Sequence, residues 1–135
     1  MWTNVPQSAA EATSWLTPHL QQGSAFVAET HGRVGGFAVY GPWRPSDGYR
    51  HTVEDSVYVR DDAHRHGLGS ALLGTLIDAA RRAGHRIVIA DIEAGNAASI
   101  KLHERFGFQH VGTVHEAGTK FGRWLDLTIM RLPLA

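Results

Sequence analysis

The feature that most constrains the fold is an apolar strand that runs through a polar loop into a glycine turn and a helix. The strand is Ser56–Val59, and the turn is Gly67-Leu68-Gly69, which opens an apolar-periodic helix. Such a turn directs unpaired backbone N–H groups and the positive end of the helix dipole at one point. That point suits a pyrophosphate group. We therefore expect a strand–helix unit that binds a phosphate-bearing ligand at this turn.

The hydrophobic pattern predicts a single domain over residues 1–135 with a mixed sheet of about six strands, of class α/β or α+β. The predicted strands are Ala25–Glu29, Arg33–Tyr40, Tyr49–Val59, Ile87–Ile92, Phe108–Val114 and Trp124–Leu132. The predicted helices are Ser14–Gln22, Gly67–Ala83 and Ala97–Phe106, the last capped by Asn96. Polar residues His51–Ser56 interrupt the third strand, which indicates a bulge beside a cavity. Residues 41–48 and 116–123 are interpreted as loops.

Composition excludes several classes of protein. The 13 basic residues balance 13 acidic ones, so we expect no nucleic-acid partner and no binding to an anionic membrane. No apolar run approaches the length of a membrane span, and residues 1–6 lack the pattern of a signal peptide, which predicts a cytoplasmic protein. The chain has no cysteine, and this rules out disulfides and a cysteine nucleophile.

The glycine turn is a weak signal by itself. No Gly-Lys-Ser/Thr follows it, which argues against a nucleotide-triphosphate loop. The glycine spacing argues against a dinucleotide fold, although Asp91 lies on the next predicted strand, where such folds carry an acidic residue. A metal site between His64 and His66 is disfavoured because Arg65 would repel the cation, so we expect no metal.

A second motif, Asn96–Phe108, lies downstream and makes the glycine turn a more specific signal. Together the two motifs resemble those of GNAT-fold N-acetyltransferases. The closer resemblance is to the bacterial branch that acetylates phosphinothricin, methionine sulfoximine and methionine sulfone, and it covers nearly the whole chain from Ala25 onward. It is carried by Trp43-Arg44, Asp47–Glu54, Ser56–Val59, Asn96, Ser99-Ile100, Leu102–Glu104, Gly107-Phe108 and Gly118–Asp126. Within the last of these, Lys120–Trp124 is typical of that branch.

The resemblance implies acetyl-CoA as the acetyl donor, a small amine or amino acid as the acceptor, and a homodimer. It assigns cofactor binding to Val57, Tyr58, Val59, Arg65, His66, Gly67, Leu68, Gly69, Ser70, Asn96 and Arg105. The first three would pair with the pantetheine arm like an added strand. For the acceptor it points to Asp47, Gly48 and Tyr49, and we add Arg50 as a partner for an amino-acid carboxylate.

The resemblance also places two catalytic candidates. Glu54 occupies the position of the base that takes a proton from the acceptor's ammonium group. His103 stands where many members carry a tyrosine that protonates the leaving thiolate. Without a cysteine to carry the acetyl group, we expect direct attack in a ternary complex, with an N–H near Val57 stabilising the oxyanion.

One departure from the family leaves alternatives open. Relatives begin with a further strand and helix, roughly 25–30 residues at average element lengths, so we expect the hairpin at Ala25–Tyr40 to have an exposed edge. The chain is then either an N-acetyltransferase or a non-catalytic acetyl-CoA-binding protein of the same fold. Protein N-termini or a polyamine are alternative acceptors. Arg44, Arg50, Lys120 and Arg123 argue against a polyamine.

Overall fold

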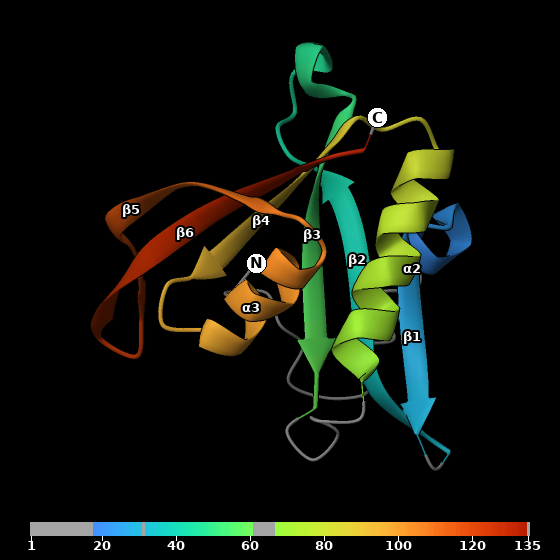
Figure 1. Ribbon diagram of the computed structural model, residues 1–135, viewed down its shortest axis with the longest axis horizontal. Helices are drawn as coiled ribbons and strands as arrows, with labels where there is room; N and C mark the ends of the chain where they lie inside the picture. Colours follow the sequence, from blue (N-terminus) through green and yellow to red (C-terminus); the bar gives the residue numbers. More distant parts are fainter. Residues whose placement is uncertain (1–17, 31, 61–66, 135) are drawn as a thin grey trace.

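The computed structural model describes residues 18–30, 32–60 and 67–134 (Figure 1). These residues form one six-stranded sheet in the order β1-β2-β3-β4-β6-β5. The strands are β1 (Ala25–Thr30), β2 (Arg33–Pro42), β3 (Thr52–Val59), β4 (Ile87–Glu93), β5 (Gln109–Lys120) and β6 (Arg123–Pro133). Only β3 and β4 pair in parallel among these strands, and the other neighbours are antiparallel. The predicted mixed sheet and its α/β class are confirmed.

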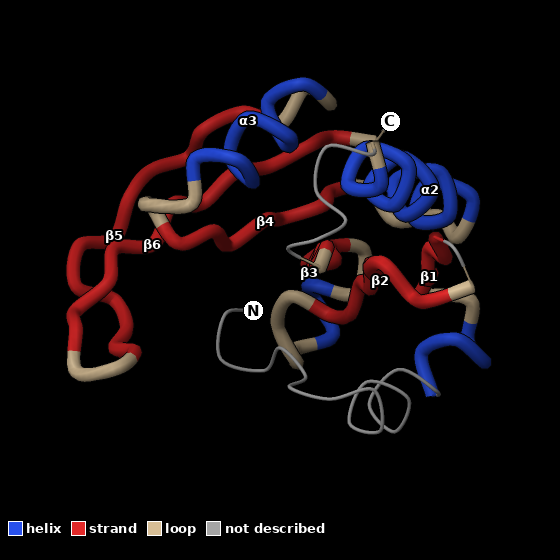
Figure 2. Tube along the Cα trace, turned by 90° about the horizontal axis from the view of Figure 1, so that it is seen from below, coloured by secondary structure: helices blue, strands red, loops and turns tan. Residues whose placement is uncertain are grey.

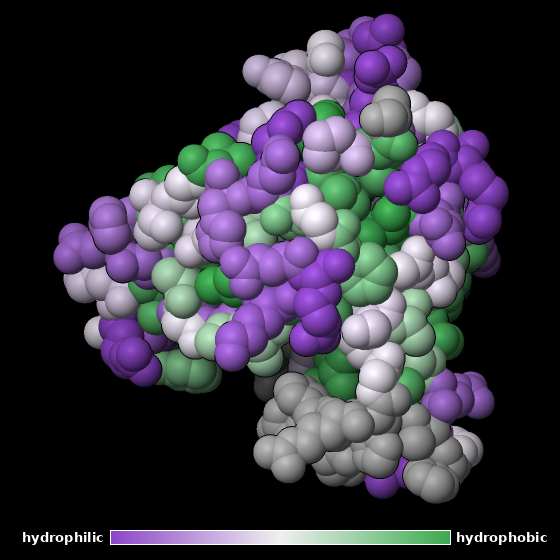
Figure 3. Space-filling model, viewed as in Figure 1, coloured by the Kyte–Doolittle hydropathy of each residue, from purple (hydrophilic) through white to green (hydrophobic). Residues whose placement is uncertain are grey.

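Two helices cover one face of this sheet (Figure 2). Helix α2 (Leu68–Arg82) makes the crossover between β3 and β4, and α3 (Ala97–Arg105) connects β4 to β5. The inner side of α2 buries Leu73 and Leu76 completely, against a core that contains Val88 and Met130. On the outer surface, hydrophilic side chains gather over α3, with apolar surface beside them toward α2 (Figure 3). None of the described helices is long and apolar enough to span a membrane.

The α2 helix follows from its sequence pattern. Its buried residues recur at the three- and four-residue spacing of a helix and form one apolar stripe: Leu72, Leu73, Leu76, Ile77 and Ala80. Gly67 precedes the helix in a left-handed conformation, with φ of 73°, which a residue with a side chain adopts only with strain. The predicted helix Gly67–Ala83 is longer than the observed one by one residue at each end, and these residues are its N-cap, Gly67, and its C-cap, Ala83.

Gly36 brings β2 and β3 together at the end of their ladder, where it pairs with Val59. A Cβ atom placed on Gly36 would lie 2.5 Å from the backbone oxygen of Tyr58 and 3.2 Å from Cδ1 of Leu72. We expect Gly36→Ala to lower the free energy of unfolding by about 1–3 kcal/mol, because a backbone atom in a ladder has little freedom to move. Chemical denaturation measures this loss. Gly41→Ala on the same strand is the control, since its Cβ would meet nothing within 4 Å.

The start of β3 corrects one prediction. The strand begins at Thr52, while Asp47–Tyr49 forms a short 3-10 helix, η1, that Arg50 ends. The predicted bulge in β3 is also wrong, because the described β2–β3 register runs without a shift from Gly36–Val59 to Pro42–Val53. The polar residues are accommodated by strand alternation, which sends neighbouring side chains to opposite faces of the sheet.

The region predicted as a loop between the last two strands is mostly strand. β5 continues to Lys120 and β6 begins at Arg123, so the reversal takes only Phe121 and Gly122, both with positive φ. The turn-forming residues instead produce a register shift between Val114 and Gly118. The Asp126 carboxylate stabilises this irregularity by accepting a hydrogen bond from the Glu116 backbone N–H at 2.9 Å.

The other sequence predictions agree closely with the structure. The hairpin of β1 and β2 forms as expected, and β1 is an edge strand of the described sheet. The Asn96 side chain caps α3 by accepting a hydrogen bond from the Ser99 N–H at 3.1 Å. The predicted first helix is helical from residue 18 to 22, and its earlier part lies outside the described residues.

Candidate active site

The two parallel strands diverge soon after they meet. β3 and β4 pair through only three positions, Thr52–Ile87, Val53–Val88 and Glu54–Ile89. Beyond Glu54, β3 remains paired with β2, and β4 continues its pairing with β6 as far as Glu93. The sheet therefore opens into a fork at this point, with β3 on one side and β4 on the other.

The hydrogen-bond pattern shows which backbone groups of β3 face the fork. Trp43 N–H donates to Thr52 O, and Arg60 N–H donates to Gly35 O, so even-numbered residues of β3 bond to β2. In an antiparallel ladder the alternate residues direct their N–H and C=O groups to the other side. Those residues are Asp55, Val57 and Val59. The backbone of Tyr58 therefore faces β2, and only its flanking valines are placed to pair with an added strand.

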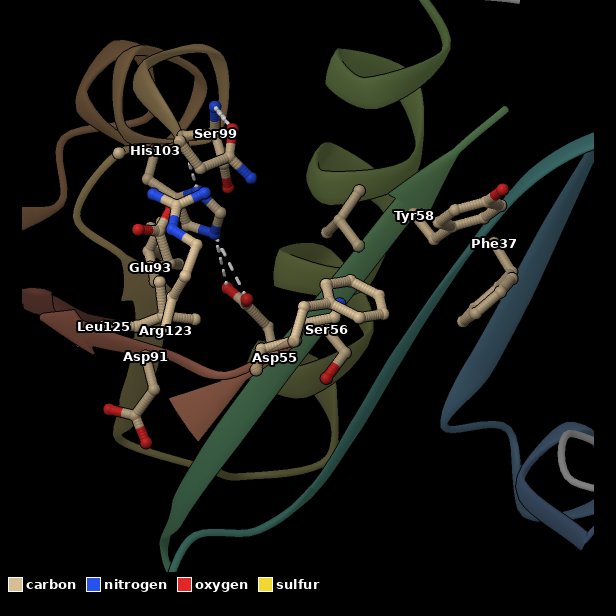
Figure 4. A pocket seen from close by; sticks show the side chains of 16 residues that line it. Phe37, Asp55, Ser56, Tyr58, Asp91, Glu93, Ser99, His103, Arg123 and Leu125 are labelled. Carbon is tan, nitrogen blue, oxygen red and sulfur yellow. Dashed lines mark hydrogen bonds and ion pairs between the residues drawn. The ribbon is translucent and has the colours of Figure 1, made fainter. Parts of the chain in front are cut away.

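A cleft of about 590 Å³ occupies the fork (Figure 4). Residues from β2, β3, β4, α3 and the β5–β6 turn line it. They are Phe37, Asp55, Ser56, Val57, Tyr58, Asp91, Ile92, Glu93, Gly95, Asn96, Ser99, His103, Lys120, Phe121, Arg123 and Leu125. The cleft thus brings together His103, Asn96 and the two β3 positions Val57 and Tyr58, which lie far apart in the sequence.

His103 is buried at the wall of the cleft, with 2% of its surface exposed. Its Nε2 lies 3.0 Å from Asp55 Oδ2, and its Nδ1 lies 2.8 Å from Ser99 O (Figure 4). Both nitrogens face acceptors, an arrangement that favours the doubly protonated imidazolium form of the ring. Burial alone would lower the pKa of His103, but the negative charge and hydrogen bond of Asp55 outweigh it and raise the pKa.

Glu54 lies on the other face of the sheet from His103. Asp55, on the helix side, is buried, and strand alternation turns Glu54 away from it. Asp91 of β4 lies on that same open face, because its neighbours Ala90 and Ile92 pack into the core beneath the helices. Burial raises the pKa of Glu54 to about 7, and a side-chain hydrogen bond with Asp91 and its negative charge contribute to the rise.

The start of α2 lies close to the end of β3. A Cβ on Gly69 would lie 3.3 Å from Leu102 of α3 and 3.8 Å from Val59 of β3, so this glycine lets the three elements approach. The first bond within the helix runs from Ala71 N–H to Gly67 O. The N–H groups of Leu68, Gly69 and Ser70 precede it and have no acceptor within the helix. The predicted cofactor residues Arg65 and His66, and the disfavoured metal ligand His64, lie outside the described residues.

Several other predicted residues are not among those that line this cleft, namely Glu54, Val59, residues 67–70, Arg105 and residues 47–50. Arg105 is the last residue of α3 and is exposed, at the opposite end of the helix from Asn96. The predicted acceptor residues lie in and beside η1, where Arg50 Nη1 contacts Asp47 Oδ2 at 3.4 Å. Asp47 and Arg50 line a separate pocket of about 420 Å³ beside His85. Gly48 and Tyr49 are exposed in the same element.

Sequence reasoning missed the carboxylates that pair with the two catalytic candidates. Asp55 is 4% exposed in a strand that feeds the core, and Asp91 is the only charged residue in the apolar run Ile87–Ile92. A charged residue in such a run is itself a signal, because buried charges require partners. The partners, however, come from other elements, and the signal does not say which ones.

Comparisons with known proteins show the family to which this fold belongs. The acetyltransferase (GNAT) family profile matches residues 2–108. An L-methionine sulfoximine/L-methionine sulfone acetyltransferase of Pseudomonas aeruginosa is 48% identical over 136 residues, covering 99% of this chain and 79% of the relative. A phosphinothricin N-acetyltransferase of Alcaligenes faecalis is 39% identical over 132 residues, covering 96% and 67%.

Among solved structures, a putative acetyltransferase of Salmonella typhimurium with its cofactor acetyl-CoA has a TM-score of 0.89 and 43% identity, covering 100% of this chain and 79% of that one. The family profile thus spans most of the chain, and close relatives align along almost all of it. This chain belongs to the GNAT family of acetyltransferases and is an acetyl-CoA-dependent N-acetyltransferase.

Proposed function

We propose that the chain transfers an acetyl group from acetyl-CoA to the amine of a small amino acid or analogue, of the methionine sulfone, methionine sulfoximine or phosphinothricin type. The observation that carries this proposal is the fork between β3 and β4, with the half-buried carboxyl of Glu54 at its apex and His103 on its wall. The acceptor class comes from relatives that share 48% and 39% of their aligned residues with this chain.

The residues of the fork suit acetyl-CoA. Val57 and Val59 direct backbone N–H and C=O groups toward the opening, and these would pair with the amide-bearing pantetheine arm. The N–H groups of Gly69 and Ser70, at the positive end of α2, would bind the pyrophosphate. Asn96 has its side-chain oxygen engaged as a helix cap, and its amide nitrogen remains a donor toward the cleft. The substrate supplies the acetyl thioester.

The proposed chemistry divides between the two faces of the fork. Glu54 accepts the proton of the acceptor's ammonium group, which frees the nitrogen lone pair to attack the thioester carbonyl. A base with a pKa of about 7 is suited to proton transfer near neutral pH. A backbone N–H of Asp55 or Val57 would stabilise the oxyanion. His103, held as an imidazolium, would supply the proton that the departing thiolate takes up.

The acceptor's carboxylate requires a cationic partner. Lys120 and Arg123, from the two sides of the β5–β6 turn, both line the cleft. They are better placed for this role than Arg50, which lines the separate pocket with Asp47. We therefore propose that the carboxylate binds at the Lys120–Arg123 end of the cleft, rather than at Asp47, Gly48, Tyr49 and Arg50 as expected from the sequence.

The alternative of a non-catalytic acetyl-CoA-binding protein is not favoured, because enzymes are similar to this chain along nearly its whole length. The homodimer that the resemblance implies stays a proposal. It is supported by exposed apolar side chains on the β5–β6 hairpin, including Val111, Phe121 and Trp124. Sedimentation or light scattering would measure the oligomeric state.

The function is tested by mixing the chain with acetyl-CoA and an acceptor and following the release of free thiol. Methionine sulfone and phosphinothricin should support turnover, while a polyamine and a peptide with a free N-terminus should give much less. Calorimetry with acetyl-CoA measures binding independently of turnover, and so distinguishes an enzyme from a protein that only binds the coenzyme. Binding without turnover on any acceptor would favour the non-catalytic alternative, and no binding at all would remove the assignment.

A further inference from the structure

The open face of the fork holds a pair of carboxyl groups whose second member has no role in the mechanism above. Glu54 is the last residue of β3 that pairs with β4, and its partner in the register is Ile89. Asp91 follows Ile89 by two positions, which returns its side chain to the same face of the strand. Asp91 also lines the cleft, where its carboxylate points away from His103 (Figure 4).

We propose that Asp91 is a positioning residue for the base: it holds the Glu54 carboxyl at the fork by a side-chain hydrogen bond, and its negative charge sets the pH above which the chain deprotonates its acceptor. This inference rests on the proposed function, because it assigns a partner to the base of that reaction. Two neighbouring carboxyl groups in a partly buried site do not both ionise readily, since their charges repel.

The surroundings of Glu54 leave Asp91 as its principal partner among the described residues. From β4, Asp91 provides both a hydrogen bond and a negative charge. On its own strand, the Asp55 carboxylate adds a weaker repulsion from the opposite face, and that group already pairs with His103. From β2, the residue opposite Glu54 is Gly41, which carries no charge. Burial is the largest cause of the raised pKa of Glu54, so removal of Asp91 should lower this pKa only partly.

The arrangement has a chemical consequence. Below its pKa of about 7 the Glu54 carboxyl is protonated and donates this hydrogen bond to Asp91, whose negative charge attracts the incoming ammonium group. When the ammonium group enters, its positive charge favours ionisation of Glu54, which is then ready to accept a proton. Asp91 does not have to touch the reacting nitrogen for this to occur, because it acts through Glu54.

The test is the pH profile of kcat/KM for Asp91→Asn. The acidic limb should move to lower pH by about one unit, because the repulsion is gone and the amide donates a hydrogen bond to the Glu54 carboxylate. The ratio of kcat/KM at pH 6 to that at pH 8 should then rise roughly fivefold. A loss of equal size at every pH, or a limb that stays in place, would overturn the proposal. Asp78→Asn, at an exposed position on α2, is the matched control and should leave the profile unchanged.

A second measurement does not depend on turnover. Carbon-13 NMR of the glutamate carboxyl groups, with Glu54 assigned through Glu54→Gln, follows the titration of Glu54 directly. The midpoint should fall in Asp91→Asn and in a second variant, Asp91→Ser, and an unchanged midpoint would contradict the inference. An inactive wild-type chain in which this midpoint still responds to Asp91 would defeat the proposed reaction while leaving the carboxyl pair in place.

Discussion

Glu54→Gln is expected to lower kcat/KM for the acceptor by about 10²–10⁴-fold at neutral pH. Glutamine keeps the size of the side chain and its hydrogen bonding to Asp91, but it has no lone pair basic enough to take a proton from an ammonium group. The KM for acetyl-CoA should change little, because the residues proposed to bind it are Val57, Val59 and the start of α2. Steady-state kinetics that follow thiol release measure both parameters.

The size of this loss should depend on pH. As the pH rises, more of the acceptor is already the neutral amine, so the variant should approach the wild type at alkaline pH. Glu104→Gln removes an exposed carboxylate from α3 and should leave the kinetics unchanged. Full activity of Glu54→Gln at neutral pH would show that another group is the base.

Asp55→Asn is expected to lower the free energy of unfolding by about 3–5 kcal/mol below pH 6.5, the largest stability effect predicted for this chain. The reason is that the substitution leaves the imidazolium of His103 buried without its counter-charge, 3.0 Å from a neutral amide. Denaturant unfolding of the variant and the wild type at a series of pH values measures the difference. Glu104→Gln is again the matched control, because it breaks a His110–carboxylate pair of the same kind that is about half exposed, and such pairs contribute about 1 kcal/mol or less.

The pH dependence of this effect has a definite sign. The pKa of His103 is raised in the folded state relative to its ordinary value of 6.5. The ion pair therefore contributes its full stability below pH 6.5, and this contribution is lost as the pH rises through the folded-state pKa. The difference in the free energy of unfolding between the wild type and Asp55→Asn should therefore become smaller over the same pH range. If the difference in the free energy of unfolding is already small at pH 6, His103 is not an imidazolium in the folded protein.

The local elements were largely predictable from the sequence, because they depend on spacing along the chain. The apolar stripe of α2, the Asn96 cap of α3 and the β1–β2 hairpin are each specified by residues within a few positions of one another. The errors arose where turn-forming residues lie inside strands. Residues Glu116–Gly118 form an irregularity that Asp126 stabilises from β6, and the polar centre of β3 fits without a bulge because Glu54 and Asp55 point to opposite faces.

The sequence alone determined the family and the identities of Glu54 and His103 as residues to test. It did so because the motifs around the glycine turn and Asn96 are contiguous in the chain. Only the tertiary structure decided the partners, Asp55 for His103 and Asp91 for Glu54, and separated the η1 residues Asp47–Tyr49 from the cleft. The physical reason is that protonation and access depend on burial and on charges a few ångströms away, and these come from strands and helices that are remote in sequence.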